Sequence, residues 1–463
     1  MSPGLKLSAG FASSVGRIVP LAWPVFIGQI AVLAFATIDT IFVARASATD
    51  LAALAIGSAA YITIFIGFMG ALMAIGPIVG RLFGAQEFAA AGRAAHQAVW
   101  IALALSVLGS SLLLFPGPFL ALAQASPEVD HKVRAYLMAL ACSLPASLLF
   151  TVFRGFNTAV SRPKAPMLIQ LGGLALKAPL SAALVFGIPA LGLPALGVVG
   201  CGIATAVAMW AQLVLGWLTL RHDPSYAPFA LLGRGLDKPE AAALKAQLKL
   251  GIPMGATILI DVTGFAFMSI FIARLGTTVV AGHQLVANLV SMMFMVPLAL
   301  GNATGALVAQ RLGARDAHDA DRLAWHGLGL ACAVAAVLGL AVLAGREPIL
   351  SLYTRDAAVI AVALPLLAWL VLFHIADAAA AVSAAVLRAH QVVLLPVLIY
   401  AIALWGVGQG GGWLLAFDSS GQVPAAMRGA PGYWIASTAA LSVAALLSIA
   451  LMRFTLRTRR PVP

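Results

Sequence analysis

Twelve long apolar runs, separated by short clusters of charged residues, limit the folds that this chain can adopt. The hydrocarbon core of a bilayer is about 30 Å thick, and a helix needs roughly 20 apolar residues to cross it. Only 10% of the 463 residues are charged, whereas a soluble domain carries about 25%. The sequence therefore predicts an all-α membrane protein with twelve transmembrane helices, near 19–43, 51–79, 95–118, 133–158, 166–188, 197–220, 250–273, 277–309, 324–345, 358–387, 394–417 and 432–452.

The composition and motifs exclude several other classes of protein. The net charge of +12 is spread over short clusters, which offer no basic face to a nucleic acid. The three cysteines lie in apolar runs, which excludes a disulfide scaffold and a cysteine-based metal site. No P-loop, HExxH, GxSxG or zinc-ligand spacing occurs, so neither an enzyme nor an ATP-driven pump is expected. The first apolar run is too long for a cleaved signal peptide.

The distribution of basic residues predicts the orientation in the membrane. Of the 28 Lys and Arg residues, 20 lie on the side of both termini, 7 lie on the other side and Lys177 falls inside a span. Loops rich in Lys and Arg stay in the cytoplasm, so both termini are expected there. The longest hydrophilic stretch, 221–249, is predicted to be a cytoplasmic linker between an N-lobe (1–220) and a C-lobe (250–463). Asp237, shortly before Pro239, indicates the start of a short amphipathic helix that leads into span seven.

The two sides of the linker repeat one another at a constant offset of 229 positions. Residues 41–45 (IFVAR) match 270–274 (IFIAR), and Pro24, Gly76 and Gly84 match Pro253, Gly305 and Gly313. A duplicated unit of six spans enters the membrane twice from the same side, so the two lobes form a parallel repeat. Two such bundles that rock about a cleft suit alternating access, with Pro24 and Pro253 as candidate hinges.

Three aspartates lie well inside predicted spans: Asp39, Asp261 and Asp377. A charged side chain at a helix centre costs about 2.5–3.5 kcal/mol on insertion scales and marks a functional site by default. Asp261 and Asp377 fall at similar depth near the middle of the membrane and are expected to share a site. Asp39 is expected to be the main cation or proton acceptor of the N-lobe. Lys177 either snorkels, pairs with an aspartate or contacts substrate.

Weaker polar signals accompany these aspartates. Gln284 and Asn288 lie four residues apart on one face of span eight, where interhelical hydrogen bonding is as good an explanation as ligand binding. His374 lies one turn before Asp377, where a proton-linked role competes with ordinary packing.

Short motifs occur along essentially the whole chain: residues 37–40 (TIDT), 253–263, 282–284 (GHQ), 377–388, 153–156 (FRGF) and 197–206. In their order and spacing they resemble the NorM-like branch of the multidrug and toxic compound extrusion (MATE) family. The resemblance implies two V-shaped lobes of six helices and export of cationic, amphipathic drugs in exchange for H+ or Na+, with no other cofactor. It implies a monomer in a bacterial inner membrane.

The resemblance also implies roles for individual residues. It implies that Asp39 belongs to the N-lobe cavity, and that Asp261 and Asp377, with Gln284 nearby, form a C-lobe cation site that would bind Na+ in a sodium-coupled protein. Three departures favour H+, or mixed coupling: Asp261 replaces the usual Glu, Phe373 the frequent Tyr and Lys177 the frequent Asn. The residues expected to line the substrate cavity are Asp39, Lys177, Asn288, Phe294, Phe373 and His374.

Two other functions remain open at this point. A lipid-intermediate flippase of the same broad superfamily would need a strongly cationic cavity for a pyrophosphate, and the sequence places only Lys177 clearly inside a span. A non-transporting membrane assembly protein or membrane-bound enzyme would have no need of unsymmetrical carboxylates on a duplicated scaffold.

The charge bias makes a direct prediction about topology. Reporter fusions at residue 463 and in the 46–50 loop should report opposite sides of the membrane, because an odd number of crossings separates them. Alkaline phosphatase and fluorescent-protein fusions measure this. A result that places both on one side would contradict the twelve-span arrangement and the parallel repeat.

Overall fold

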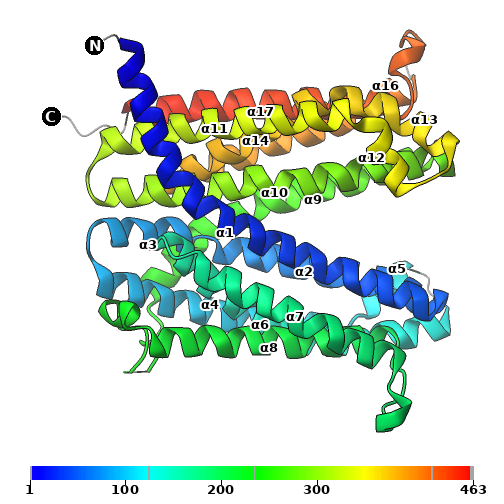
Figure 1. The fold of residues 1–463 in the computed structure, drawn as a ribbon, viewed down its shortest axis with the longest axis horizontal. Helices are drawn as coiled ribbons and strands as arrows, with labels where there is room; N and C mark the ends of the chain where they lie inside the picture. The colour runs from blue at the N-terminus through cyan, green and yellow to red at the C-terminus, as the bar shows by residue number, and fades with distance from the viewer. Residues whose placement is uncertain (1–2, 124–125, 234, 419–420, 459–463) are drawn as a thin grey trace. The chain divides into compact units, whose positions relative to one another are not determined.

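The computed structural model describes residues 3–123, 126–233, 235–418 and 421–458, which form long helices joined by short loops (Figure 1). In these ranges twelve helical segments are long and apolar enough to cross a membrane. The prediction of an all-α membrane protein with twelve spans is therefore confirmed. Arg234, Arg459 and Arg460, which were counted on the cytoplasmic side, lie outside the described residues.

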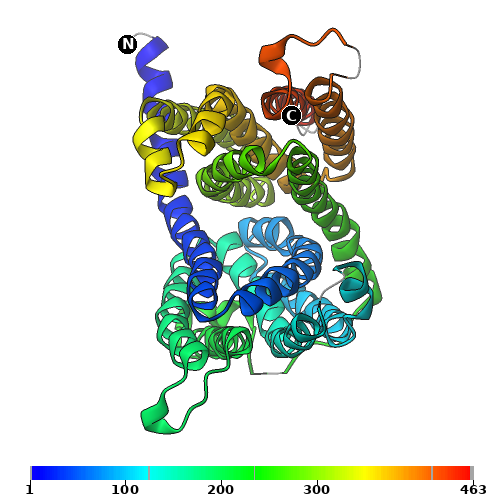
Figure 2. The ribbon, with the colours of Figure 1, turned by 90° about the vertical axis from the view of Figure 1, so that its right-hand side faces the viewer.

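The helices group into two compact units, each of which contains one copy of the repeat for most of its length. One unit is Ile27–Gly255, and the other is Met1–Phe26 together with Ala256–Pro463. Figure 2 views the helices of each unit end-on.

In the unit Ile27–Gly255, the long helix α6 packs against α2, α4 and α8 and contributes more buried core residues than any other helix. Its apolar face is continuous from Val133 to Phe156, which are both buried. The elements of this unit are the second part of α1 (Pro3–Ala46), α2 (Ala48–Leu72), α3 (Ile75–Gly84), α4 (Phe88–Leu114), α5 (Gly117–Ala123), α6 (Pro127–Ala159), α7 (Lys164–Phe186), η1 (Pro189–Leu191), α8 (Val198–His222), η2 (Pro224–Phe229) and the start of α9 (Ala241–Ala273).

In the second unit, α14 has the same central place and packs against α10, α11 and α17. Two of its spans are interrupted. A short 3-10 segment follows Pro365 in the tenth span, and a π-helical stretch occupies the eleventh. The elements are α10 (Thr277–Gly313), α11 (Ala317–Ala344), α12 (Arg346–Tyr353), α13 (Ala357–Leu366), η3 (Leu367–Trp369), α14 (Leu370–Ala389), α15 (Leu394–Tyr400), η4 (Ala401–Gly410), α16 (Gly411–Ala416), η5 (Ala425–Met427) and α17 (Ala430–Thr458).

Helices α1 and α9 each belong to both units. The division falls after Phe26 in α1 and after Gly255 in α9, two residues beyond Pro24 and Pro253. These two division points are themselves 229 positions apart, so the crossing is part of the repeat. The predicted lobe boundaries at 220 and 250 follow the order of the spans and stay a prediction, whereas the compact units divide inside these two helices.

Polar contacts attach the first part of α1 to the second unit. Arg17 donates to the Asp319 carboxylate at 2.8 Å, and that carboxylate also pairs with Arg311 and Arg322. The Ser14 hydroxyl lies 2.8 Å from Nδ1 of His326. Within this unit, the start of α1 and the end of α17 lie at one end of the helices and α12 lies at the other (Figure 1).

The linker differs from the sequence prediction at its end. Residues 235–240 are not helical, and α9 begins at Ala241 and continues without interruption into the seventh span. The predicted helix start at Asp237 is therefore wrong. The Asp237 carboxylate instead pairs with Nδ1 of His96 at 2.8 Å, and Trp100 donates to the Asp237 carbonyl. This tie to α4 fixes the chain in an extended form.

The start of the linker is stabilised by Asp223. Its carboxylate accepts hydrogen bonds from the hydroxyl and the N–H of Ser225 and pairs with Arg162 at 3.1 Å. The Ser225 hydrogen bonds hold the pKa of Asp223 below its usual range.

The close contact between α9 and α2 in the unit Ile27–Gly255 predicts an effect of glycine substitution. A Cβ at Gly251 would overlap the Ala71 carbonyl, whereas a Cβ at Gly76 meets nothing within 4 Å. Gly251→Ala should therefore lower the thermal stability, by about 1–3 kcal/mol for an overpacked site, and Gly76→Ala should not. Fluorescence-detected size-exclusion after heating in detergent measures both. Equal melting of the two variants would show that the helices separate easily at this point.

Candidate functional site

Asp39 and Lys177 meet inside the unit Ile27–Gly255. Lys177 on α7 donates from Nζ to Oδ2 of Asp39 on α1 at 2.6 Å. The same ammonium donates to the Phe35 carbonyl at 3.2 Å and lies 4.6 Å from the centre of the Phe35 ring. Lys177 is 1% exposed and Asp39 is 7% exposed. Of the three alternatives for Lys177, the structure shows pairing with an aspartate.

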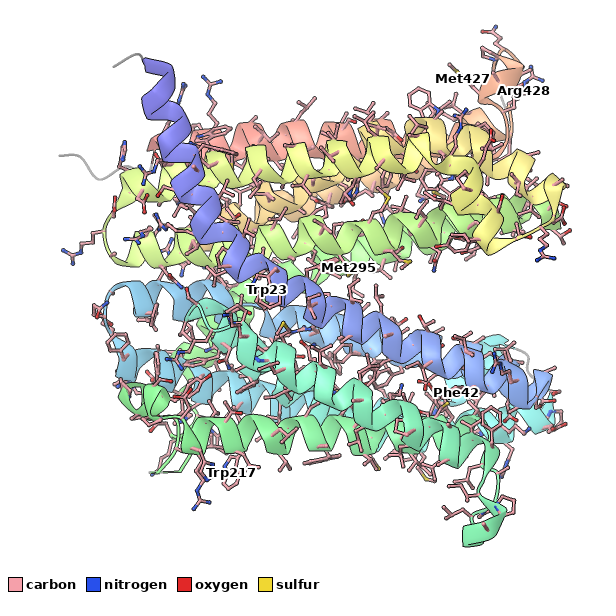
Figure 3. All side chains as sticks on the ribbon, in the orientation of Figure 1. Trp23, Phe42, Trp217, Met295, Met427 and Arg428 are labelled. Carbon is pink, nitrogen blue, oxygen red and sulfur yellow. The ribbon has the colours of Figure 1, made fainter. Side chains whose placement is uncertain are left out.

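The packing of α7 on α1 brings Lys177 within reach of Asp39. Phe42, three residues after Asp39, packs edge-on against Phe186 at the end of α7, with 5.8 Å between ring centres (Figure 3). A Cβ at Gly28 would overlap the side chain of Gln170 on α7. α1 and α7 therefore approach closely enough for the lysine stem to lie between them.

The motif 197–206 completes the surroundings of the pair. A Cβ at Gly200 would lie 2.7 Å from the backbone of Leu184, so only glycine lets α8 pack this closely on α7. This contact brings the thiol of Cys201 beside Asp39, together with the hydroxyl of Ser181. Tyr136 on α6 interacts electrostatically with the Asp39 carboxylate.

The first residue of the motif has a separate, structural purpose. Gly197 has φ +54°, which strains any other residue, and the Asp50 carboxylate lies where its Cβ would be. That carboxylate accepts from the Val198 N–H at 3.3 Å and pairs with Lys132 at 3.3 Å. A carboxylate at the N-terminus of α8 stabilises the helix through its free N–H groups.

The second unit holds the other two aspartates, Asp261 and Asp377. Asp261 lies on α9 and Asp377 on α14, both are partly buried, and their charges interact with one another and with the Tyr400 hydroxyl. Among the described residues neither carboxylate has a basic partner within ion-pair distance. Tyr400 was not among the predicted site residues, because a tyrosine in an apolar run is usually a packing residue.

The other predicted site residues of the second unit differ in their exposure and contacts. Gln284 and Asn288 are exposed on α10, and Asn288 accepts from the Tyr353 hydroxyl at 3.3 Å. Phe294 is partly buried. Phe373 is 3% exposed and packs on Phe265 and Trp434. The predicted roles of these residues stay predictions.

His374 is fully buried on α14, one turn before Asp377. Neither of its ring nitrogens has a hydrogen-bond partner among the described residues. Its place beside the carboxylate pair is consistent with the predicted location, and its proton-linked role stays a prediction.

His283, adjacent to Gln284, joins three helices. Its Nδ1 accepts from the Trp434 indole N–H at 3.3 Å, and its Nε2 lies 2.9 Å from the Ser269 hydroxyl. An indole N–H only donates, so Nδ1 carries no proton and Nε2 carries it. A neutral imidazole on α10 thus connects α9, the helix that carries Asp261, with α17.

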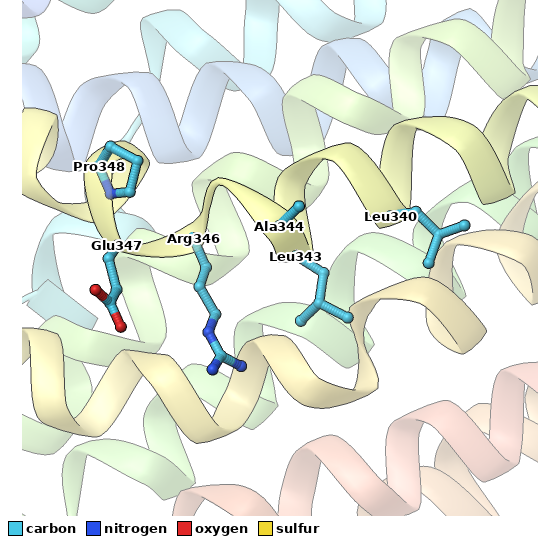
Figure 4. A pocket seen from close by; sticks show the side chains of 6 residues that line it. All are labelled: Leu340, Leu343, Ala344, Arg346, Glu347 and Pro348. Carbon is cyan, nitrogen blue, oxygen red and sulfur yellow. The ribbon is translucent and has the colours of Figure 1, made fainter.

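A shallow pocket of about 570 Å³ lies where α11 meets α12 (Figure 4). None of the predicted site residues lines it. Its lining residues are Leu340, Leu343, Ala344, Arg346, Glu347 and Pro348. In the described part of the chain, no group of three or more His, Cys, Asp or Glu side chains is placed to hold a metal ion.

Comparison with known proteins adds two findings. The MatE family model matches residues 24–183 and 253–414, and the two matches begin 229 positions apart, which is the offset of the internal repeat. Probable multidrug resistance protein NorM of Aromatoleum aromaticum is 40% identical over 96% of this chain and 94% of its own length. Multidrug resistance protein PmpM of Pseudomonas aeruginosa is 32% identical over 96% of this chain and 93% of its own.

Solved structures share the fold at lower sequence identity. The crystal structure of the eukaryotic MATE transporter AtDTX14 superposes with a TM-score of 0.84 at 20% identity, over 97% of this chain and 99% of that one. An outward-facing multidrug resistance MATE transporter superposes with a TM-score of 0.85 at 17% identity, over 95% of both chains.

The buried ion pair predicts how single and double substitutions differ. Removing one partner of a buried pair costs about 3–5 kcal/mol, because the other charge is left without compensation. Asp39→Asn should therefore lower the thermal stability strongly, since Lys177 would lose its counter-ion. Asp39→Asn combined with Lys177→Met should recover most of that loss. Thermal unfolding of the purified variants measures the difference, and a double variant no more stable than Asp39→Asn would contradict a paired state.

Proposed function

Because this chain belongs to the MATE family, we propose that it is a secondary active antiporter that exports cationic, amphipathic drugs in exchange for H+ or Na+ by alternating access. Its relatives carry the names of multidrug resistance proteins and transporters, and none is named as an enzyme. Their identity to this chain extends over almost its whole length, which supports a common activity.

The observation that carries the proposal is the carboxylate pair Asp261 and Asp377. Two neighbouring carboxylates repel one another when both are ionised, and among the described residues no basic side chain compensates them. A proton or a bound cation relieves this repulsion. The ion that enters therefore changes the charge of the site and favours one arrangement of the helices over another.

The choice between H+ and Na+ depends on the ligands available. Na+ prefers several oxygen ligands, and the shorter side chain of Asp261 reaches less far than Glu. Among the described residues only two carboxylates meet at this point, and Gln284 is exposed on α10. These features favour H+, with Na+ as the second possibility.

Alternating access requires places where the chain bends. Helices α1 and α9 are the elements that each belong to both compact units, and both change unit two residues after a proline. A proline inside a helix removes one backbone hydrogen bond and lowers the cost of bending. We propose Pro24 and Pro253 as the hinges.

We place the protein in a bacterial inner membrane as a monomer, with both termini in the cytoplasm. The charge bias of the loops supports this orientation. The start of α1 and the end of α17 lie at the same end of their unit (Figure 1), as an even number of spans requires. A flippase for a pyrophosphate-linked lipid is less favoured, because the ammonium of Lys177 is already neutralised by Asp39.

Transport in proteoliposomes tests the proposal directly. Ethidium movement would be followed with a pH gradient alone and then with a Na+ gradient alone. We expect the pH gradient to drive movement of ethidium against its own gradient. Movement with neither gradient, or none in either case for ethidium and fluoroquinolones alike, would contradict a drug antiporter.

The carboxylate pair also makes a prediction about variants. Asp377→Asn should leave a folded protein that binds drug weakly but has no gradient-driven turnover, because one carboxylate cannot form the coupled pair. Asp261→Glu should retain transport, since it keeps the charge and adds one methylene. Counterflow and gradient-driven uptake separate binding from coupling. Wild-type rates and pH dependence in both Asp377→Asn and Asp261→Asn would place the coupling site elsewhere.

A further inference from the structure

Pairing with Lys177 changes how Asp39 can interact with ions, compared with a carboxylate that has no partner. A charge inside a membrane span is costly, and here two opposite charges 2.6 Å apart cancel one another. The pair as a whole is neutral. Asp39 is therefore not an uncompensated acid like Asp261 and Asp377, although all three lie inside spans.

The groups that face the carboxylate supply no second positive charge. Ser181 and Lys177 come from α7, Cys201 from α8 and Tyr136 from α6. Among the described residues, only the ammonium of Lys177 pairs with Asp39, and it does so from a fully buried position. A mobile cation that approached Asp39 would meet that ammonium at close range and be repelled.

The second oxygen of the carboxylate is not hydrogen-bonded to Lys177. Oδ1 of Asp39 is buried, and the Ser181 hydroxyl and the Cys201 thiol are the polar groups beside the carboxylate. The lysine ammonium has a second set of contacts in the carbonyl and the ring of Phe35. Without the lysine charge, the carboxylate and the hydroxyl would provide oxygen ligands to a cation.

We propose that Lys177 is the resident cation of Asp39 and that it excludes mobile cations, both Na+ and the cationic groups of drugs, from this site. The inference rests on the proposed transport function, because it assigns cation selectivity to Asp261 and Asp377 alone. Lys177 is thus a specificity-determining residue. At the repeat offset of 229, Asp39 corresponds to Met268, so the second unit has no carboxylate at the matching position.

Equilibrium binding of tetraphenylphosphonium to the purified full-length protein tests the inference. This monovalent cation does not titrate, so its binding reports the charge of the site. In an Asp261→Asn/Asp377→Asn background we expect no saturable binding. Adding Lys177→Met should create a saturable site, with at least about tenfold more tetraphenylphosphonium bound than in the background at the same free concentration. Its affinity should fall as the pH is lowered, because protons compete for the uncovered carboxylate.

Two matched variants identify the source of that binding. Lys177→Arg keeps a positive charge beside Asp39. In the Asp261→Asn/Asp377→Asn background it should therefore create no site for tetraphenylphosphonium. Asp39→Asn combined with Lys177→Met removes both charges and should abolish the new site. Binding that persists in this last variant would show that Asp39 is not the acceptor and would overturn the inference.

A second measurement covers the case in which the doubly substituted background does not fold. In the otherwise unaltered protein, Lys177→Met should raise the tetraphenylphosphonium stoichiometry by one site per chain. Unchanged stoichiometry and affinity would overturn the inference, as would Asp39-dependent cation binding in the protein that retains Lys177. These outcomes concern binding alone, so they are separate from a failure of gradient-driven transport, which would contradict the proposed function.

Discussion

A charge inside a bilayer must be compensated, and the rest of this structure depends on how that requirement is met. The two halves of the chain meet it differently. In one, Lys177 reaches Asp39 between α1 and α7 and produces a neutral pair. In the other, Asp261 and Asp377 interact with one another without a basic partner in the described chain. The first arrangement is neutral by itself, whereas we propose that the second is stabilised by a proton or a cation.

The scaffold around these groups is repeated, but the groups are not. Central helices α6 and α14 organise their units in the same way, and the division points in α1 and α9 keep the repeat offset. Residues 153–155 (FRG) echo 387–389 (LRA) at a second offset of 234 positions, and at that offset Ser143 on α6 matches Asp377. Ser143 donates to the Tyr61 hydroxyl and carries no charge. In the alternating access that we propose, these few polar differences between the repeats decide which unit responds to ions.

The spans, their number and the three intramembrane aspartates could be predicted from the sequence, because apolar length and a rare charge are local signals. The partner of Lys177 could not be predicted, because a lysine in this apolar run is equally compatible with snorkelling, with pairing to an aspartate and with contact to substrate. The sequence gives no sign that Tyr400 and Cys201 lie beside the aspartates, because tyrosine and cysteine occur routinely as packing residues in apolar runs. Asp237 has a favourable helix-start pattern, but a contact with His96, 141 residues away, holds it in an extended segment. Contacts between residues so far apart in the chain produce no periodic pattern in the local sequence, so they cannot be predicted from it.

The division of α1 between units also affects how the protein is made. Arg17 and its acceptor Asp319 are separated by 302 positions, and ribosomes add about 5–20 residues per second. The beginning of the chain therefore leaves the ribosome tens of seconds before its ionic partner exists. During that interval the N-terminal part of α1 lacks its ionic partner. This part of the chain, although synthesised first, is therefore among the last segments to reach its final contacts.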